Sequence, residues 1–191
     1  MKPRPRNIEH INFPLKKDKV IECILHLTTK GLELTSYRVV KLLYLADREH
    51  LREFGRPISF DRYVAMENGP VASYAYDVMK GLKRSGTNVE DLPFSVVKIG
   101  GRKYAQDPKR AINRKLFSRS DLQILDETCH KYGGWTFSQL YHETHKHEAY
   151  DKAWKNRSSN ADAMRFEDFF EGMENQDKLI ESVKLESGHY R

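Results

Sequence analysis

Histidines and acidic residues are concentrated in residues 141–148, where they could bind a metal ion. A zinc-binding helix needs two histidines four residues apart, so that both rings point the same way. Here His142 and His145 are three residues apart, and His145 and His147 are two apart, so the rings face different sides of a helix. The segment is therefore interpreted as a solvated helix end without a metal, and a weak site completed by a distant residue is the alternative.

The cysteines and glycine-rich segments do not predict nucleophilic chemistry. Cys23 and Cys129 fall on apolar faces of helix-like patterns, without basic neighbours that would lower the pKa of a thiol. The chain lacks a Gly-x-Ser-x-Gly elbow, a Gly-Lys-Ser phosphate loop and a Gly-x-Gly-x-x-Gly fingerprint. Adjacent acids such as Glu167 and Asp168 diverge on a helix and form no acid–base pair. We expect no catalytic residue, no enzyme activity, no cofactor and two buried thiols in a reducing cytoplasm.

A basic segment, residues 96–119, could bind nucleic acid. Its net charge is +7, and Lys98, Arg102 and Lys103 could contact phosphates while Tyr104 stacks on a base. Basic residues on a hairpin edge also protect a sheet against edge-to-edge aggregation. A nucleic-acid-binding regulator that uses this segment and the N-terminal arm is the alternative function. Its affinity would fall steeply with salt, because bound phosphates release counterions.

Residues 37–76 hold a dense set of polar aromatic and charged side chains around a turn at Asn68-Gly69-Pro70. One interpretation is a helix–strand–helix unit whose buried aspartates and arginines satisfy one another. The other is a recognition surface, because tyrosine and arginine supply many of the strongest contacts in protein interfaces. The residue types alone leave both open.

Helices must position most of these groups, according to the spacing of the apolar residues. Helices are expected over residues 18–30, 36–54, 70–84 and 120–132, with another from Thr136, a short piece ending near Trp154, and one or two in the acidic C-terminal part. The longest is predicted to begin at a cap on Thr35 or Ser36 and to end where Gly55 adopts a left-handed conformation. It is the expected central element.

Two regions are predicted to form β structure. Residues 58–66 alternate as a strand would, and Gly100-Gly101 predicts a two-residue hairpin between residues 94–99 and 102–105. Pro70 is expected at the first position of its helix, and Gly69 at a backbone angle closed to other residues. The predicted fold class is mainly α with a small antiparallel β element, in one compact domain.

Length and charge limit the function classes. The 191 residues suit a single domain, and the longest apolar runs are far shorter than the roughly 18 residues that a membrane helix requires. The net charge of +6 is uneven: residues 1–17 carry +4, residues 18–95 carry 0 and residues 120–191 carry −5. Basicity confined to a terminal arm and one hairpin, opposite an acidic C-terminal third, favours a protein partner over nucleic acid.

Three runs in the middle of the chain form an ordered signature. They are Lys41-Leu42-Leu43-Tyr44-Leu45-Ala46-Asp47, Gly55-Arg56-Pro57, and Asp61-Arg62-Tyr63-Val64-Ala65-Met66-Glu67-Asn68-Gly69-Pro70-Val71. Their order and spacing resemble the Panacea domain, the SocA-like antitoxin family of bacteria and their phages. Leu140 to His145 is similar to the family's second, weaker motif, and the resemblance covers roughly residues 18–157.

The resemblance implies a non-enzymatic, cytoplasmic antitoxin that is encoded beside a toxin gene and neutralises its partner by direct binding. Some relatives also deliver the toxin to a protease. We expect a basic N-terminal arm over 1–17, the Panacea domain over 18–157, and an acidic helical extension over 158–191 packed on the same domain. No membrane or nucleic-acid partner is expected.

Residues of the signature are divided between contact and support. The residues expected at the toxin surface are Tyr44, Asp47, Arg62, Tyr63, Asn68 and Tyr74. Gly55, Pro57, Gly69 and Pro70 are expected to be structural.

Overall fold

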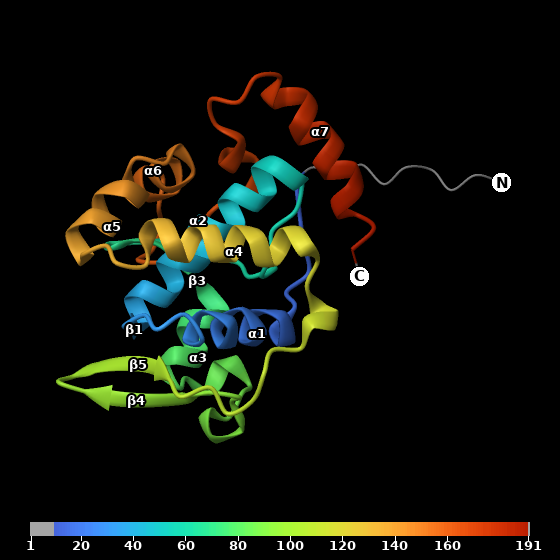
Figure 1. Cartoon of the computed structure of the whole chain (residues 1–191). Coiled ribbons are helices and arrows are strands. Elements are labelled where there is room, and N and C mark those ends of the chain that lie inside the picture. Colours follow the sequence, from blue (N-terminus) through green and yellow to red (C-terminus); the bar gives the residue numbers. More distant parts are fainter. Residues whose placement is uncertain (1–9, 191) are drawn as a thin grey trace.

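The computed structural model describes residues 10–190 and shows an α+β fold of helices and two small antiparallel sheets, one of which lies at the edge of the molecule (Figure 1). The helices are α1 (Lys17–Thr28), α2 (Ser36–Phe54), α3 (Ser73–Lys80), α4 (Arg119–Tyr132), α5 (Phe137–His145), α6 (Glu148–Lys155) and α7 (Gln176–Ser187). The strands are β1 (Leu34–Thr35), β2 (Tyr63–Met66), β3 (Gly69–Ala72), β4 (Ser95–Ile99), β5 (Arg102–Gln106) and β6 (Asp162–Ala163). Short 3-10 turns are η1 (Lys83–Ser85), η2 (Val89–Asp91), η3 (Arg114–Leu116) and η4 (Phe166–Phe170). The predicted fold class is confirmed.

Helix α2 is the central element, as predicted. The Thr35 side chain caps it by accepting a hydrogen bond from the Arg38 backbone N–H, and Gly55 ends it at φ 72°. Its inward face is almost completely buried and packs against α4, α3, α5 and β3. In Figure 1, α2 runs through the middle of the molecule behind α4.

The two sheets lie at different places on α2. One has the strand order β1-β5-β4, and its β4–β5 hairpin turns at Gly100 and Gly101 with φ of 54° and 82°, which confirms the predicted hairpin. The other has the order β3-β2-β6 and pairs Tyr63 with Ala72 and Met66 with Gly69. The β4–β5 hairpin projects from the body of the molecule in Figure 1.

The predicted helix over residues 70–84 is wrong at both ends. Gly69–Ala72 is strand β3, with Pro70 opposite Ala65, and the helix spans only Ser73–Lys80. The Asp61 carboxylate accepts hydrogen bonds from the backbone N–H groups of Tyr74 and Ala75 at 2.9 and 2.8 Å, so it satisfies the first turn of α3 from 13 residues away. Because Asp61 lies 13 residues before Tyr74, no sequence pattern near the start of α3 predicts this cap. The predicted strand 58–66 is likewise shorter, because only Tyr63–Met66 pairs.

Both chain ends contribute to the core. Ile11 and Phe13 are buried, and the Phe13 ring lies 5.7 Å from that of Phe60 and 5.4 Å from that of Tyr190. Residues 1–9 of the expected basic arm lie outside the described residues. Near the C-terminus, Phe169 is completely buried, so this region packs against the same core. The domain boundaries expected from the sequence stay a prediction.

Candidate functional site

The turn between β2 and β3 presents two exposed side chains, Glu67 and Asn68, on a firmly held backbone. From α6, the Tyr150 hydroxyl donates to the carbonyl of Met66 at 2.9 Å. From α5, the His145 Nε2 lies 3.4 Å from the carbonyl of Glu67. The turn, which we call the hairpin tip (residues 66–70), is thus fixed by side chains from separate helices.

Lys41 of α2 supplies the third attachment and is completely buried. Its Nζ donates to the carbonyl of Pro70 at 2.8 Å and lies 5.1 Å from the centre of the Tyr37 ring. No carboxylate in the described part of the chain forms an ion pair with it. Burial alone therefore holds the pKa of Lys41 well below its usual value.

Gly69 makes room for this lysine. Its φ is +96°, which confirms the predicted backbone angle, and a Cβ at this position would lie 2.6 Å from Lys41 Nζ. Pro70 lies in strand β3 and not at the start of a helix, so the predicted position is wrong, and a structural role stays a prediction. A proline fits here because β3 is an edge strand of its sheet.

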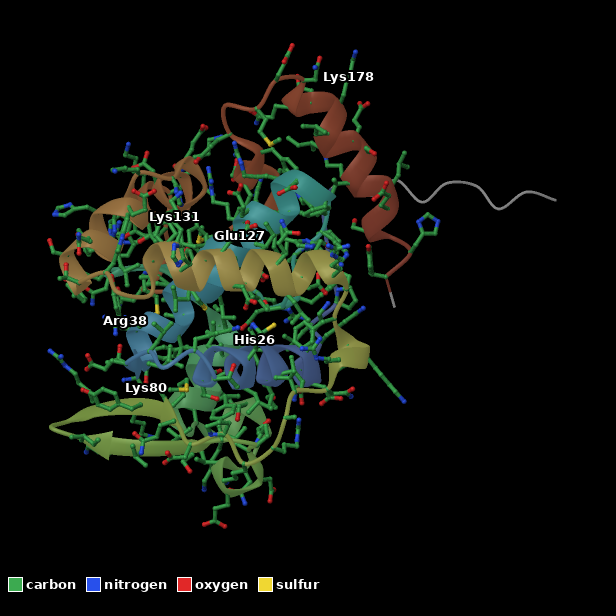
Figure 2. The ribbon with its side chains drawn as sticks, in the orientation of Figure 1. His26, Arg38, Lys80, Glu127, Lys131 and Lys178 are labelled. Carbon is green, nitrogen blue, oxygen red and sulfur yellow. The ribbon has the colours of Figure 1, made fainter. Side chains whose placement is uncertain are left out.

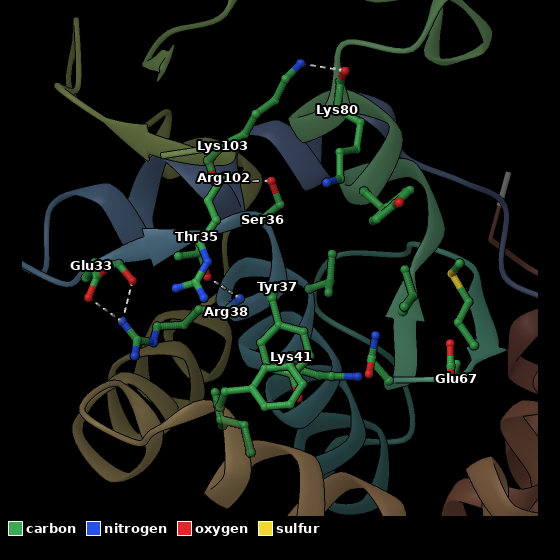
Figure 3. Close-up of a pocket in the computed structure, with 18 residues that line it drawn as sticks. Glu33, Thr35, Ser36, Tyr37, Arg38, Lys41, Glu67, Lys80, Arg102 and Lys103 are labelled. Carbon is green, nitrogen blue, oxygen red and sulfur yellow. Dashed lines mark hydrogen bonds and ion pairs between the residues drawn. The ribbon is translucent and has the colours of Figure 1, made fainter. Parts of the chain in front are cut away.

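A cavity of about 500 Å³ opens beside the hairpin tip (Figure 3). Its walls come from the first turns of α2, from the hairpin tip, from α3, from the turn of the β4–β5 hairpin and from α5. Tyr37 and Lys41 lie side by side on α2, Arg102 extends from β5 towards the start of α2, and Lys103 points to the Lys80 carbonyl (Figure 3). Segments that are more than 60 residues apart in the sequence thus meet around one hollow.

Basic side chains outnumber acidic ones in the lining of the cavity. The basic residues that line it are Arg38, Lys41, Lys80, Arg102 and Lys103, and the acidic ones are Glu33 and Glu67. Arg38 Nη1 lies 3.9 Å from the Glu33 carboxylate, and Lys103 Nζ donates to the carbonyl of Lys80 at 2.6 Å. The first turn of α2 contains no acidic residue, so the positive end of the helix dipole is not neutralised locally.

Tyr37 brings an unusual hydroxyl to this cavity. Its oxygen is shielded from solvent and has no hydrogen-bond partner among the described residues. Burial raises the pKa of this hydroxyl, with a smaller contribution from Tyr141. The Tyr37 ring packs against Phe137, with ring centres 4.4 Å apart.

A row of aromatic rings continues from the cavity along α5 and α6. Phe137 is 53% exposed and stacks on Tyr141, which lies 3.7 Å from the His145 ring. His145 contacts Tyr150 at 4.4 Å, and Tyr150 stacks on Trp154 at 6.0 Å. We call these five residues the aromatic row. Two of its members, His145 and Tyr150, contact carbonyl groups of the hairpin tip. Part of the ring surface of the row is exposed, above all at Phe137.

Four of the six residues predicted to contact a toxin are buried, so the expectation that they are exposed is wrong. They are Tyr44, Asp47, Tyr63 and Tyr74, with 0%, 1%, 3% and 6% exposure. Arg62 and Asn68 are exposed. A role in toxin contact was predicted for all six and stays a prediction, but only Arg62 and Asn68 reach the surface.

Three of the buried residues, Tyr44, Asp47 and Tyr63, form hydrogen bonds inside the protein. Asp47 accepts hydrogen bonds from the backbone N–H groups of Ile58 and Ser59, both at 2.8 Å, and from the Tyr63 hydroxyl at 2.7 Å. The Tyr44 hydroxyl bonds the His147 ring at 2.9 Å. The carboxylates of Asp47 and Asp61 thus accept hydrogen bonds from backbone N–H and hydroxyl groups. They are not paired with arginine side chains, as one interpretation of the sequence suggested.

The other groups singled out from the sequence lie apart from one another. His142 is exposed, His145 lies beneath the hairpin tip and His147 faces the core. Within residues 10–190, no group of three or more His, Cys, Asp or Glu residues is placed to hold a metal. The expectation of two buried free thiols is confirmed, and burial raises the pKa of Cys129 to about 11. No helix of the described chain is both long and apolar enough to cross a bilayer.

The basic hairpin divides between the cavity and the surface. Lys98 is exposed on β4, while Arg102 and Lys103 line the cavity. Tyr104 pairs with Thr35 and Val97 in the sheet and is half-buried. Binding of nucleic acid by this hairpin stays a prediction.

Sequence reasoning missed the cavity and its two central residues, Tyr37 and Lys41. One signal was present, because Lys41 interrupts an otherwise apolar run from Val39 to Ala46. A lysine within a buried stripe needs a partner for its amine, and that partner is a carbonyl brought from the hairpin tip.

Comparison with known proteins places the signature in a family. No curated protein and no solved structure matches the chain. The family described as antitoxin SocA-like, Panacea domain, matches residues 39–155, which is more than half of the chain and includes most of α2, the hairpin tip, α5 and α6. The chain therefore belongs to the SocA-like antitoxin family with a Panacea domain.

Proposed function

We propose that this protein is a cytoplasmic antitoxin that neutralises a toxin, the product of the adjacent gene, by binding it directly through the hairpin tip and the cavity beside it. Membership of the antitoxin family supports a toxin as the partner. The form of the surface supports direct binding. Neutralisation by direct binding requires no catalytic reaction by this protein.

The observation that carries this proposal is the way in which the hairpin tip is held. Lys41, His145 and Tyr150, from three different helices, each contact one of its carbonyls. Burial of the Lys41 amine without an acidic partner costs free energy that an apolar side chain would avoid. Such an arrangement fixes the exposed Glu67 and Asn68 in one geometry, which lowers the entropy lost when a partner binds.

The composition of the surrounding surface also supports binding to a protein. Aromatic residues and arginine are enriched in the centres of interfaces, where they supply most of the binding free energy. Phe137, Tyr141 and Trp154 of the aromatic row are partly exposed next to the tip, and Arg102 is exposed at the cavity mouth. We therefore expect the toxin to cover both features.

Co-expression with the adjacent gene product tests the proposal. Wild-type protein should restore growth that the toxin arrests and should co-purify with the toxin. Asn68→Arg places a larger charged side chain at the hairpin tip and should weaken both effects. The control is Asn160→Arg, an equal change at an exposed residue outside the site, which should behave as wild type. Unchanged growth arrest with wild-type protein would refute the antitoxin function.

Delivery of the toxin to a protease is the finer form of this proposal, supported by the resemblance to relatives with that role. It predicts a shorter toxin half-life in cells that contain the antitoxin. A toxin that is neutralised at an unchanged half-life would show that occlusion is sufficient.

A further inference from the structure

The cavity beside the hairpin tip has the charge of an anion-binding site. Five basic residues line it against two acidic ones. The first turn of α2, whose 19 residues give it a full helix dipole, adds positive potential at the same wall. Arg102 is exposed and forms no ion pair within residues 10–190, so its charge is available to a partner. Figure 2 shows Arg38 and Lys80 at this same end of the molecule, far from Lys178 on α7.

Two buried polar groups at the cavity retain hydrogen-bonding capacity. The Tyr37 hydroxyl has no partner among the described residues, although its oxygen is shielded from water. The Lys41 amine binds a single carbonyl and retains at least one further N–H donor. A buried donor without a partner costs roughly 1–3 kcal/mol, so a ligand that accepts from it gains that free energy on binding.

The walls of the cavity distinguish between kinds of anion. Apolar side chains, Val40, Val71 and Leu140, form part of the lining, which suits a side chain more than a solvated phosphate. Glu33 and Glu67 also lie at the cavity and would repel a nucleic-acid backbone, which carries a charge at every nucleotide. One carboxylate on an apolar stem carries a single negative charge, so it meets less of this repulsion than a nucleic-acid backbone does, and its stem packs on the apolar part of the lining.

We infer that the cavity receives an aspartate or glutamate side chain from a loop of the toxin. The exposed Arg102 and the half-buried Lys80 attract the carboxylate at the mouth, and the Tyr37 hydroxyl, which its neighbours cover in the free protein, donates to it once those side chains shift on binding. This inference rests on the proposed function and adds the chemistry of the contact. It makes an acidic side chain the part of the toxin that selects this antitoxin.

Charge reversal tests the inference with the purified full-length protein and the purified product of the adjacent gene. The double variant Lys80→Glu, Arg102→Glu should bind the toxin at least about tenfold more weakly than wild type in low salt, and the difference should shrink in about 0.5 M salt. The double variant Lys131→Glu, Lys178→Glu is the matched control, because it changes the net charge equally and both residues are exposed and lie outside the cavity. It should bind as wild type does.

Two further measurements examine the contact itself. Tyr37→Phe should weaken toxin binding by about fivefold while the free protein keeps its stability, because the deleted hydroxyl has no intramolecular partner. A zero-length carbodiimide reagent, which joins an amine to a carboxylate, should link Lys80 or Lys103 to an Asp or Glu of the toxin, as read by mass spectrometry.

The outcomes separate this inference from the proposed function. If wild-type protein does not bind the toxin, both are refuted. If it binds, but the double variant and Tyr37→Phe bind equally well and all cross-links fall outside the cavity, the acidic contact is refuted while the antitoxin function stands. Cross-links between two copies of this chain at Lys80 would make a second copy the occupant of the cavity and overturn the inference. The inference would also be overturned if the double variant lost binding to DNA and kept its binding to the toxin.

Discussion

Replacement of Gly69 by alanine should destabilise the protein by about 3 kcal/mol. Alanine at φ +96° costs roughly 1–2 kcal/mol, because its Cβ crowds the neighbouring carbonyl. The new Cβ would also lie 2.6 Å from Lys41 Nζ and 3.0 Å from both His145 Cε1 and Thr144 Oγ1. The buried amine must then leave the Pro70 carbonyl, at a cost of roughly 1–2 kcal/mol for the lost bond.

Urea unfolding of purified protein measures this change, and Gly101→Ala provides the matched control. Gly101 also has a positive φ, +82°, but nothing lies within 4 Å of a Cβ at that position. It should therefore show only the backbone cost, about half of the effect at Gly69. For a chain of this size, about 3 kcal/mol corresponds to a fall in Tm of roughly 6–12 °C.

The same reasoning predicts coupling between Gly69 and Lys41. In a Lys41→Met background, the amine that meets the new Cβ is absent, so Gly69→Ala should cost less than it does in the wild type, although the contacts with His145 and Thr144 remain. Equal effects of the two glycine substitutions in the wild-type background would refute the argument from close approach. So would an undiminished effect of Gly69→Ala when Lys41 is methionine.

Two further predictions concern the core beneath the site. Asp47→Ala leaves the Ile58 and Ser59 backbone N–H groups without their acceptor and leaves the Tyr63 hydroxyl only the Leu43 carbonyl, so urea unfolding should show a loss of about 4 kcal/mol. A loss below about 1 kcal/mol would contradict this role. Burial, reinforced by nearby arginines, lowers the pKa of His147 from 6.5 to about 3. Between these two pH values the unfolded chain binds a proton at His147 and the folded chain does not. The contribution of His147 to stability is therefore complete above pH 6.5 and is lost as the pH falls towards 3. Stability should therefore fall by roughly 4 kcal/mol more in wild type than in His147→Gln across this window, and parallel pH profiles would contradict it.

Elements whose limits depend on neighbouring residues could be predicted from the sequence. A cap at Thr35 or Ser36 and an end at Gly55 were predicted for α2, as were the Gly100–Gly101 hairpin and a helix that starts at Thr136. Each depends on hydrogen bonds or backbone angles within about four residues, so the amino-acid types at those positions carry the information. The resemblance to the family could be identified for the same reason, because the signature consists of residue types in a fixed order along the chain.

Exposure within the signature could not be predicted in the same way. Tyr44, Asp47 and Tyr63 have residue types that are typical of a binding surface, yet they form a buried hydrogen-bonded group. A tyrosine or aspartate carries the same chemistry in an interface and in a satisfied core. Only the positions of its partners, Ile58 and Ser59 in the case of Asp47, decide between the two.

The sequence by itself determined the fold class, the central helix, the basic hairpin and the family. Tertiary structure decided that Gly69–Ala72 is a strand, that Asp61 caps α3, and that Lys41 binds the hairpin tip. It also brought the start of α2, the β4–β5 hairpin and α5 around one cavity. These features depend on contacts between residues far apart in the chain, whose free energy comes from burial and from satisfying polar groups within the assembled core, so no local pattern records them.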